Sequence, residues 1–265
     1  MRGFRDSTFG FAFRMPALSR MRYDPLSLPG SGPNFSRTPG KIDEMAKFAG
    51  EDLACVRAER LVFDRLRFAL KPGGALRLTG ANGSGKSSLL RLMAGLLKPA
   101  GGRLTWDGAG IARDPEGHRR KIAFVGHAEA LKPALSLAES LAFWARLFGA
   151  GDTQAAVARG LEAFGLAGLA DFPVRLLSAG QRRRLALARL LAAPADLWLL
   201  DEPGTGLDEA SLAMLEAAIA AHRAGGGMLA LATHGGLKLP GAAGLDLEGF
   251  APARNQPAPA DWGEA

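Results

Sequence analysis

The chain has 265 residues, of which 48% are hydrophobic and 22% are charged. These values are typical of a globular protein and exclude a mainly disordered chain. No run of about 18 uncharged apolar residues occurs, so we expect no membrane-spanning helix. The net charge of +7 suits a polyanionic ligand or an anionic surface. No Lys/Arg stripe with interleaved aromatics predicts nucleic-acid binding, and the single cysteine, Cys55, excludes an internal disulfide framework.

The two ends of the chain differ from the middle in composition. Residues 1–50 and 251–265 lack helical or strand periodicity, so we expect a disordered extension and a disordered tail around an ATPase-sized domain of residues 51–250. The extension has the Arg and Ser content of a transit peptide. Because regular patterning begins only near Leu53, we favour instead an over-extended start, with Met45 or Met21 as the initiator.

The middle of the chain alternates between strand and helix signals. In chain order we expect strands at residues 53–63, 65–70 and 75–80, a helix at 87–98, strands at 101–108 and 121–127, helices within 136–170, a helix at 181–193, a strand at 196–203, a helix at 211–224 and a last strand at 227–234. Strands that alternate with crossover helices predict an α/β fold with a largely parallel sheet.

A glycine-rich loop follows the expected strand at residues 75–80. It fits the phosphate-binding pattern G-x-x-x-x-G-K-[ST] and precedes an expected helix. Its glycines let successive backbone N–H groups point at phosphate oxygens, Lys86 can reach the β- and γ-phosphates, and the Ser87 hydroxyl can ligate Mg²⁺. The residues that we expect to contact ATP are Gly80, Ala81, Asn82, Gly83, Ser84, Gly85, Lys86, Ser87 and Ser88.

An apolar run at residues 197–200 ends in the acidic pair Asp201-Glu202. A parallel strand here would deliver both carboxylates to the edge of the sheet that holds the glycine-rich loop. We expect Asp201 to hold Mg²⁺ together with Ser87, and Glu202 to act as the general base for the attacking water. The long segment between Lys86 and Asp201 leaves room for an inserted helical subdomain.

The sequence LSAGQ at residues 177–181 opens an expected helix before the acidic pair. It resembles the LSGGQ signature of ATP-binding cassette (ABC) ATPases, with Ala179 in place of a glycine. The TGLD segment that ends at Asp208 is similar to the family's D-loop, and His234 lies where the family carries its switch histidine. The resemblance covers residues 52–236. We expect His118 and His222, which sit among polar residues, to be solvated.

The resemblance implies a P-loop NTPase of the ABC type, with a RecA-like parallel core, an antiparallel β subdomain and an inserted helical subdomain at about residues 133–182. It also implies a head-to-tail homodimer, in which the P-loop of one subunit and the signature helix of the other enclose each ATP. Ser178, Gly180 and Gln181 would contact ATP in trans, with Asp208 nearby. His234 would bridge the γ-phosphate and the attacking water.

Two positions depart from the common ABC pattern. Most of these ATPases carry a Mg²⁺-ligating glutamine after the strand at residues 121–127, where this chain has Gly126-His127. A histidine can bond a water or a phosphate but is a poor Mg²⁺ ligand. An adenine-stacking aromatic is usual at a position where this chain has Ala58, if the alignment is shifted by one residue, or otherwise Arg57. Its guanidinium plane can stack on a base, and a solvent-facing arginine is the alternative.

The Gly-His pair, the LSAGQ signature with its following basic residues and the LWLLDEP strand resemble the haem-exporter ATPases of cytochrome c maturation (CcmA type). This implies a peripheral ATPase on the cytoplasmic face of the bacterial inner membrane, with integral membrane partners of the CcmB and CcmC type. Its work would be haem export or the release of a haem-loaded carrier. The implied coupling surface lies beside His127 and the helices of residues 136–170, where Phe143, Trp144 and Phe148 fit a core role better than an interface.

Three other functions remain as alternatives. The ATPase of another small exporter would share the chemistry, but a glutamine in place of His127 would favour it. A soluble ABC ATPase that acts on ribosomes or DNA would need two cassettes or a long coiled coil, and this chain has one P-loop. A non-catalytic scaffold is disfavoured because Lys86, Asp201 and Glu202 are retained.

Overall fold

The computed structural model describes residues 46–233 and 235–252. The chain divides into two units, residues 1–40 and 41–265, and every described residue belongs to the second. Most of the extension and the tail that we expect at residues 1–50 and 251–265 lies outside the described residues. The expected disorder up to residue 50 is wrong, however, because Phe48, Ala49 and Gly50 are buried in a strand. Within the described part, no helix has the length and apolar character needed to cross a membrane.

An antiparallel sheet has the strand order β2-β1-β4-β5. Its strands are β1 (Phe48–Arg57), β2 (Arg60–Leu70), β4 (Gly101–Trp106) and β5 (Ala109–Gly110). The prediction of one strand over residues 53–63 is wrong, because the chain reverses at Ala58 and Glu59, which have φ values of 47° and 60°. Neither residue is a glycine, so the sequence carries no strong turn signal there.

A second sheet has the order β6-β7-β8-β3-β9, and each neighbouring pair is parallel. Its strands are β3 (Ala75–Thr79), β6 (Ile122–Val125), β7 (Leu197–Asp201), β8 (Met228–Ala232) and β9 (Ala243–Asp246). The short strand β9 was not predicted from the sequence. Because the strands are parallel, their carboxyl ends meet at one edge, which receives the loops that carry the candidate site.

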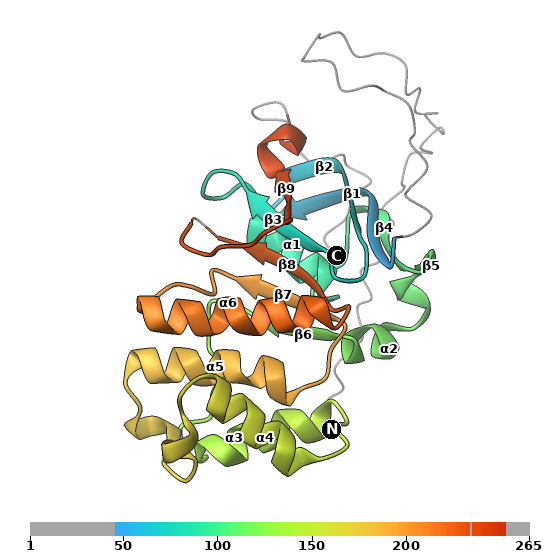
Figure 1. The fold of residues 1–265 in the computed structure, drawn as a ribbon. Coiled ribbons are helices and arrows are strands. Elements are labelled where there is room, and N and C mark those ends of the chain that lie inside the picture. The colour runs from blue at the N-terminus through green and yellow to red at the C-terminus, as the bar shows by residue number, and fades with distance from the viewer. Residues whose placement is uncertain (1–45, 234, 253–265) are drawn as a thin grey trace, which may run out of the picture. The chain divides into compact units, whose positions relative to one another are not determined.

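The helices lie on both faces of the parallel sheet (Figure 1). Helix α1 (Lys86–Met93) lies between the two sheets, and α6 (Glu209–Ala224) lies beside β8 on the opposite face. Helices α3 (Leu137–Leu147), α4 (Thr153–Ala163) and α5 (Ala179–Ala192) pack against one another as a separate group. The remaining helical segments are α2 (Pro115–Arg120), which was not predicted, and the 3₁₀ turns η1 (Ile111–Arg113), η2 (Ala167–Leu169), η3 (Val174–Leu176) and η4 (Leu247–Phe250).

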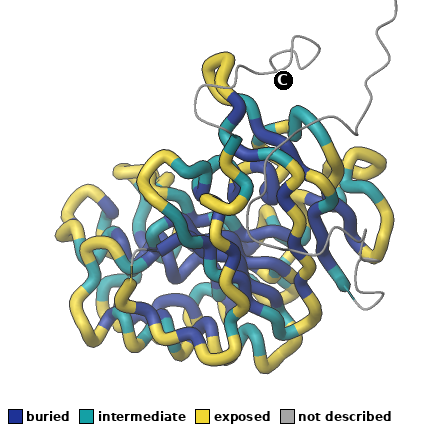
Figure 2. The backbone as a smooth tube through the Cα atoms, turned by 90° about the horizontal axis from the view of Figure 1, so that it is seen from above, coloured by how far each residue is buried: buried dark blue, intermediate teal, exposed yellow. Residues whose placement is uncertain are grey.

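Two hydrophobic cores sandwich the parallel sheet. One joins α1 to the antiparallel sheet, with Phe48, Phe63 and Leu89 completely buried. The other joins the α3–α5 group and α6 to the opposite face. Figure 2 shows the buried residues concentrated in the interior of the molecule and the exposed ones in its outer turns. The sheet edge is thus held from both sides, which keeps the loops that follow its strands in fixed positions.

The two histidines that we expected to be solvated are not. His118 is 4% exposed, and its Nδ1 accepts a hydrogen bond of 2.8 Å from the Trp106 indole N–H. Burial lowers its pKa to about 4. His222 is half-buried and stacks on Trp198, with ring centroids 4.0 Å apart. Polar neighbours in sequence therefore misled the prediction, because both rings face an aromatic side chain of the interior.

Candidate functional site

The glycine-rich loop lies between β3 and α1, as the sequence predicts. Gly80, Gly83 and Gly85 all have positive φ, at 128°, 83° and 100°. A Cβ on Gly85 would lie 2.7 Å from the Val62 Cγ1 and 2.9 Å from a Phe63 ring carbon. The loop therefore needs glycine both for its backbone conformation and for the close approach of β2.

Lys86 and Ser84 line the inside of this loop. The Lys86 side chain is 7% exposed, and its ammonium donates to the carbonyl oxygens of Gly80 (2.7 Å) and Ala81 (3.0 Å). The Ser84 hydroxyl is buried without a hydrogen-bond partner. An orphaned hydroxyl and an ammonium held by two carbonyls fit a cradle whose ligand is an anion such as a phosphate.

Ser87 and Asp201 meet across the edge of the sheet. The Ser87 hydroxyl, in the first turn of α1, donates to Oδ1 of Asp201 at 3.0 Å, and Asp201 ends β7 at 7% exposure. Among the described residues, no group of three or more His, Cys, Asp or Glu side chains could hold a metal ion. A hydroxyl beside one carboxylate suits a Mg²⁺ that takes its other ligands from water and phosphate.

Glu202 follows Asp201 with a left-handed backbone, φ 48°. Its N–H donates to the Ala232 carbonyl at 2.9 Å, and its own carbonyl accepts a 2.6 Å hydrogen bond from Arg183. Two contacts thus fix the peptide groups on both sides of this residue. His234, the expected switch histidine, lies outside the described residues.

The signature residues form the start of α5 in the helical group. Ser178 is the N-cap and makes a reciprocal box with Gln181: the Gln181 N–H donates to the Ser178 hydroxyl (3.2 Å), and the Ser178 N–H donates to the Gln181 side-chain oxygen (2.9 Å). A Cβ on Gly180 would meet nothing within 4 Å. Among the described residues, no hydrogen bond or ion pair joins this helix start to the glycine-rich loop.

Three other predicted positions are exposed. His127 follows β6 at the carboxyl edge of the sheet, Asp208 caps α6 by accepting from the Ser211 N–H (2.8 Å), and Arg57 ends β1. The structure thus brings Lys86 and Ser87 together with Asp201, while the signature residues stand apart from them.

Two residues near the site were missed by the sequence analysis. Glu248 in η4 accepts a 2.8 Å hydrogen bond from the Ala81 N–H of the glycine-rich loop. Arg183 lies among three consecutive arginines, to which the sequence analysis assigned no individual role. Its spacing of four residues from Leu187 would have placed it on the buried face of α5.

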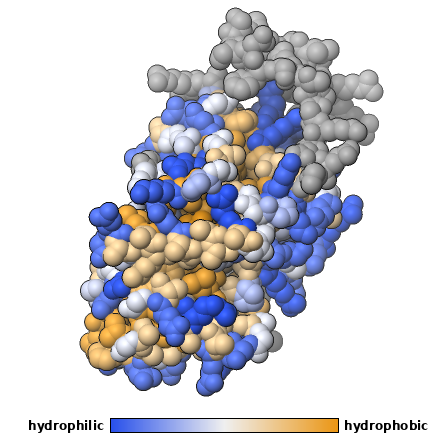
Figure 3. Space-filling view, viewed as in Figure 1, coloured by the Kyte–Doolittle hydropathy of each residue, from blue (hydrophilic) through white to orange (hydrophobic). Residues whose placement is uncertain are grey.

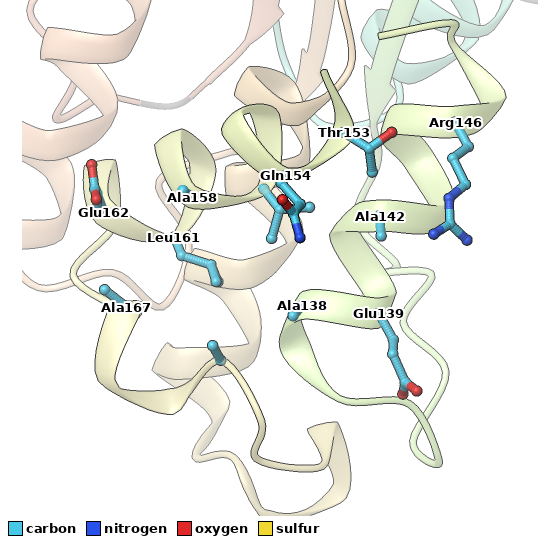
Figure 4. Close-up of a pocket in the computed structure, with 12 residues that line it drawn as sticks. Ala138, Glu139, Ala142, Arg146, Thr153, Gln154, Ala158, Leu161, Glu162 and Ala167 are labelled. Atoms are coloured by element: carbon cyan, nitrogen blue, oxygen red, sulfur yellow. The ribbon is translucent and has the colours of Figure 1, made fainter. Parts of the chain in front are cut away.

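A separate hollow of about 430 Å³ opens between α3 and α4, and none of the predicted nucleotide contacts lines it. Figure 4 shows small apolar side chains such as Ala138 and Ala158 on its walls, with Glu139, Arg146 and Glu162 around them. On the face seen in Figure 3, apolar residues also gather over α6. Phe143, for which a core role was expected, is 47% exposed on α3.

Comparison with known proteins agrees with this geometry. The ABC transporter family profile matches residues 63–205. A Rhodospirillum rubrum protein named "Cytochrome c biogenesis ATP-binding export protein CcmA" is 60% identical over 227 residues, which cover 86% of this chain and 94% of that protein. A protein of the same name from Paramagnetospirillum magneticum is 55% identical, over 79% of this chain and 98% of that one.

Among solved structures, an ATP-binding subunit of an ABC transporter superposes with a TM-score of 0.66 at 26% identity, over 71% of this chain and 79% of that one. The expected α/β fold of the P-loop ABC type is therefore confirmed. The chain belongs to the ABC transporter family, as an ABC-type ATPase of the CcmA type.

Proposed function

We propose that this chain hydrolyses Mg²⁺-ATP as one of two ATP-binding subunits in an ABC transporter complex of cytochrome c biogenesis. The observation that carries the chemistry is the contact between Ser87 and Asp201 at the open side of the glycine-rich loop. The relatives that share the name cover the chain at 55–60% identity, and they support the biological assignment. We place the ATPase domain at residues 48–250, because its first strand begins at Phe48, with a helical subdomain at about residues 133–182.

The phosphates of ATP would lie in the glycine-rich loop. The backbone N–H groups at residues 82–88 would surround them, and the Ser84 hydroxyl would find its missing partner there. Lys86 would exchange the Gly80 and Ala81 carbonyls for the β- and γ-phosphates. The dipole of α1 adds a positive end at the same place.

Ser87 and Asp201 would hold the magnesium ion. When bound, this ion would neutralise charge on the phosphate oxygens. Glu202 would take a proton from the attacking water, since it follows Asp201 at the same edge of the sheet. We assign the bridging role to His234 on the resemblance alone.

The second half of each ATP site would come from another copy of the chain. The α5 start offers Ser178, the Gly180 N–H and Gln181 at an exposed helix N-terminus, where the first N–H groups have no intrahelical partner. Asp208 would lie at the same dimer interface. In the described part of the chain, no hydrogen bond or ion pair joins this helix start to its own glycine-rich loop. A head-to-tail homodimer would bring the helix start of one copy to the glycine-rich loop of the other.

The membrane partners would bind beside His127 and the α3–α5 group. His127 and Phe143 are exposed there, and a hollow of about 620 Å³ is lined by Phe143, Leu147 and Lys132 among others. We infer partners of the CcmB and CcmC type and a peripheral location on the cytoplasmic face of the inner membrane. The ATPase of another small exporter is the alternative, and it would have different membrane partners.

Glu202→Gln tests the proposal. We expect this variant to bind ATP and to dimerise with it, but to hydrolyse ATP about 10²- to 10⁴-fold more slowly, the usual range for a lost general base. Glu162→Gln, an exposed change on α4, is the matched control and should hydrolyse at the wild-type rate. A near-normal rate for Glu202→Gln would reject the assignment of the base.

The same variant tests the partners. Tagged Glu202→Gln protein, purified with ATP from gently solubilised membranes, should bring haem-handling Ccm membrane subunits, identified by mass spectrometry. Recovery of a different permease would keep the ATPase chemistry and overturn the role in cytochrome c biogenesis.

A further inference from the structure

Arg183 is a buried arginine that touches two loops of the candidate site. It lies in the second turn of α5, and its guanidinium donates to the carbonyl oxygens of Pro203 (Nε, 3.3 Å), Gly126 (Nη1, 3.3 Å) and Glu202 (Nη2, 2.6 Å). The side chain is 6% exposed. One side chain of the signature helix is thus bonded to the loop after β6 and to the loop after β7.

Burying a charged guanidinium costs desolvation free energy, which its contacts must offset. Burial lowers the pKa of Arg183, whereas the nearby Glu129 and Asp201 carboxylates raise it. An apolar side chain of similar volume would fill the space without the desolvation cost. What such a side chain lacks is the planar fork of five N–H donors, which can hold several carbonyls at fixed angles.

The backbone of Glu202 needs hydrogen bonds that hold it in place. A residue with a Cβ is strained in the left-handed region, and it stays there only if its surroundings hold it. The Ala232 carbonyl holds the Glu202 N–H on one side. On the other side, the Glu202 carbonyl is held by the shortest of the three Arg183 bonds.

A second arginine of α5 provides an internal comparison. Arg189 is also buried, donates to the carbonyls of Phe124 (2.5 Å) and Glu129 (3.3 Å), and stacks on Trp144. It therefore fixes the loop after β6 to α5 but makes none of the contacts to the loop after β7. Only Arg183 of these two connects both loops.

We propose that Arg183 is a positioning residue for hydrolysis: by binding the carbonyls of Glu202, Pro203 and Gly126, it fixes the direction of the Glu202 carboxylate relative to the loop that carries His127. This inference rests on the proposed role of Glu202 as the base. A misplacement of about 1 Å at a reacting group can slow a reaction about 100-fold. The effect should appear in the rate of hydrolysis and spare the affinity for ATP.

The test is a double-mutant cycle in the full chain, followed by single-turnover ATP hydrolysis. Arg183→Gln should lower the rate about 10- to 100-fold in a chain that keeps Glu202. In a Glu202→Gln background, the same change should alter the residual rate less than about 3-fold, because the group it positions is absent. Arg183→Lys, which keeps the charge without the fork, should fall between wild type and Arg183→Gln. ATP affinity should stay within about 3-fold of wild type in all of them.

Arg223→Gln is the matched control. Arg223 also joins backbone carbonyls, those of Gly73 (2.9 Å) and Pro240 (2.8 Å), but at the amino ends of β3 and β9. Its loss should lower the melting temperature and leave the hydrolysis rate unchanged. Arg183 would be a merely structural residue if its loss lowered ATP affinity and stability together, or slowed hydrolysis equally in both backgrounds. A normal rate in Glu202→Gln alone would overturn the proposed base and this inference together.

Discussion

The glycine-rich loop and the signature helix are the two helix starts that we propose to bind ATP, but their polar groups are arranged differently. The loop before α1 leaves the Ser84 hydroxyl without a hydrogen-bond partner, and Ser87 at its end contacts Asp201. At the start of α5, by contrast, the polar groups of Ser178 and Gln181 are already hydrogen-bonded to each other at the surface. In the proposed ATP site, one half would be assembled inside the subunit. The other half would be a helix start, already capped, that a second copy of the chain contributes.

The largest effect should follow from damage to the assembled half. Lys86→Ala removes the ammonium from the loop, and we expect ATP affinity to fall about 10²- to 10³-fold, the cost of one lost charge-assisted phosphate contact in a buried site. Titration calorimetry would measure it, with Lys98→Ala, an exposed lysine after α1, as the control. Undiminished affinity in Lys86→Ala would mean that the loop is not the phosphate site.

A substitution in the signature helix should slow ATP hydrolysis without weakening ATP binding by the monomer. Ser178→Ala removes the cap and the proposed trans contact, and we expect hydrolysis to slow at least about tenfold. Stability should fall by about 1 kcal/mol. ATP affinity of the dilute monomer should be unchanged. Ser178→Thr keeps the hydroxyl and should retain most of the rate. If Ser178→Ala weakened ATP binding by the monomer, the signature would contact ATP within one subunit and the comparison would fail.

The smallest effect concerns pH and the cap of α6. Hydrogen bonds from Ser211 lower the pKa of Asp208 in the folded chain. The unfolded chain therefore binds the proton more readily, so this contribution to stability is present above the unfolded pKa and is lost as the pH falls through the folded one. Urea midpoints measured from pH 7 to pH 3 should fall more in wild type than in Asp208→Asn, which caps without titrating. Parallel curves would remove Asp208 as a source of acid sensitivity.

The half of the site that is assembled within the subunit was the easier to predict from sequence. Glycines with the required spacing, a lysine and an apolar strand with a terminal acid are local signals, and their contacts follow from strand order. The parallel sheet and the helix at residues 181–193 follow from periodicity in the same way, although α5 begins two residues earlier.

Other features could not be predicted because tertiary contacts decide them. The turn at Ala58 and Glu59 uses two non-glycine residues with positive φ. His118 of α2 is buried because Trp106 of β4 and Phe48 of β1 pack against its ring. In the sequence, Arg183 is one of three consecutive arginines, and the role that we propose for it depends on carbonyls 19 and 57 residues away.

The bond between Glu248 and the Ala81 N–H has a practical consequence. The last helical turn of the described chain ends within a few residues of this contact, at Phe250. A truncation before Glu248 would strip one hydrogen bond from the nucleotide loop while leaving every recognised motif in place. Affinity tags and fluorescent labels are therefore better attached elsewhere, for example at the exposed turn around Gly149–Gly151, than directly after Phe250.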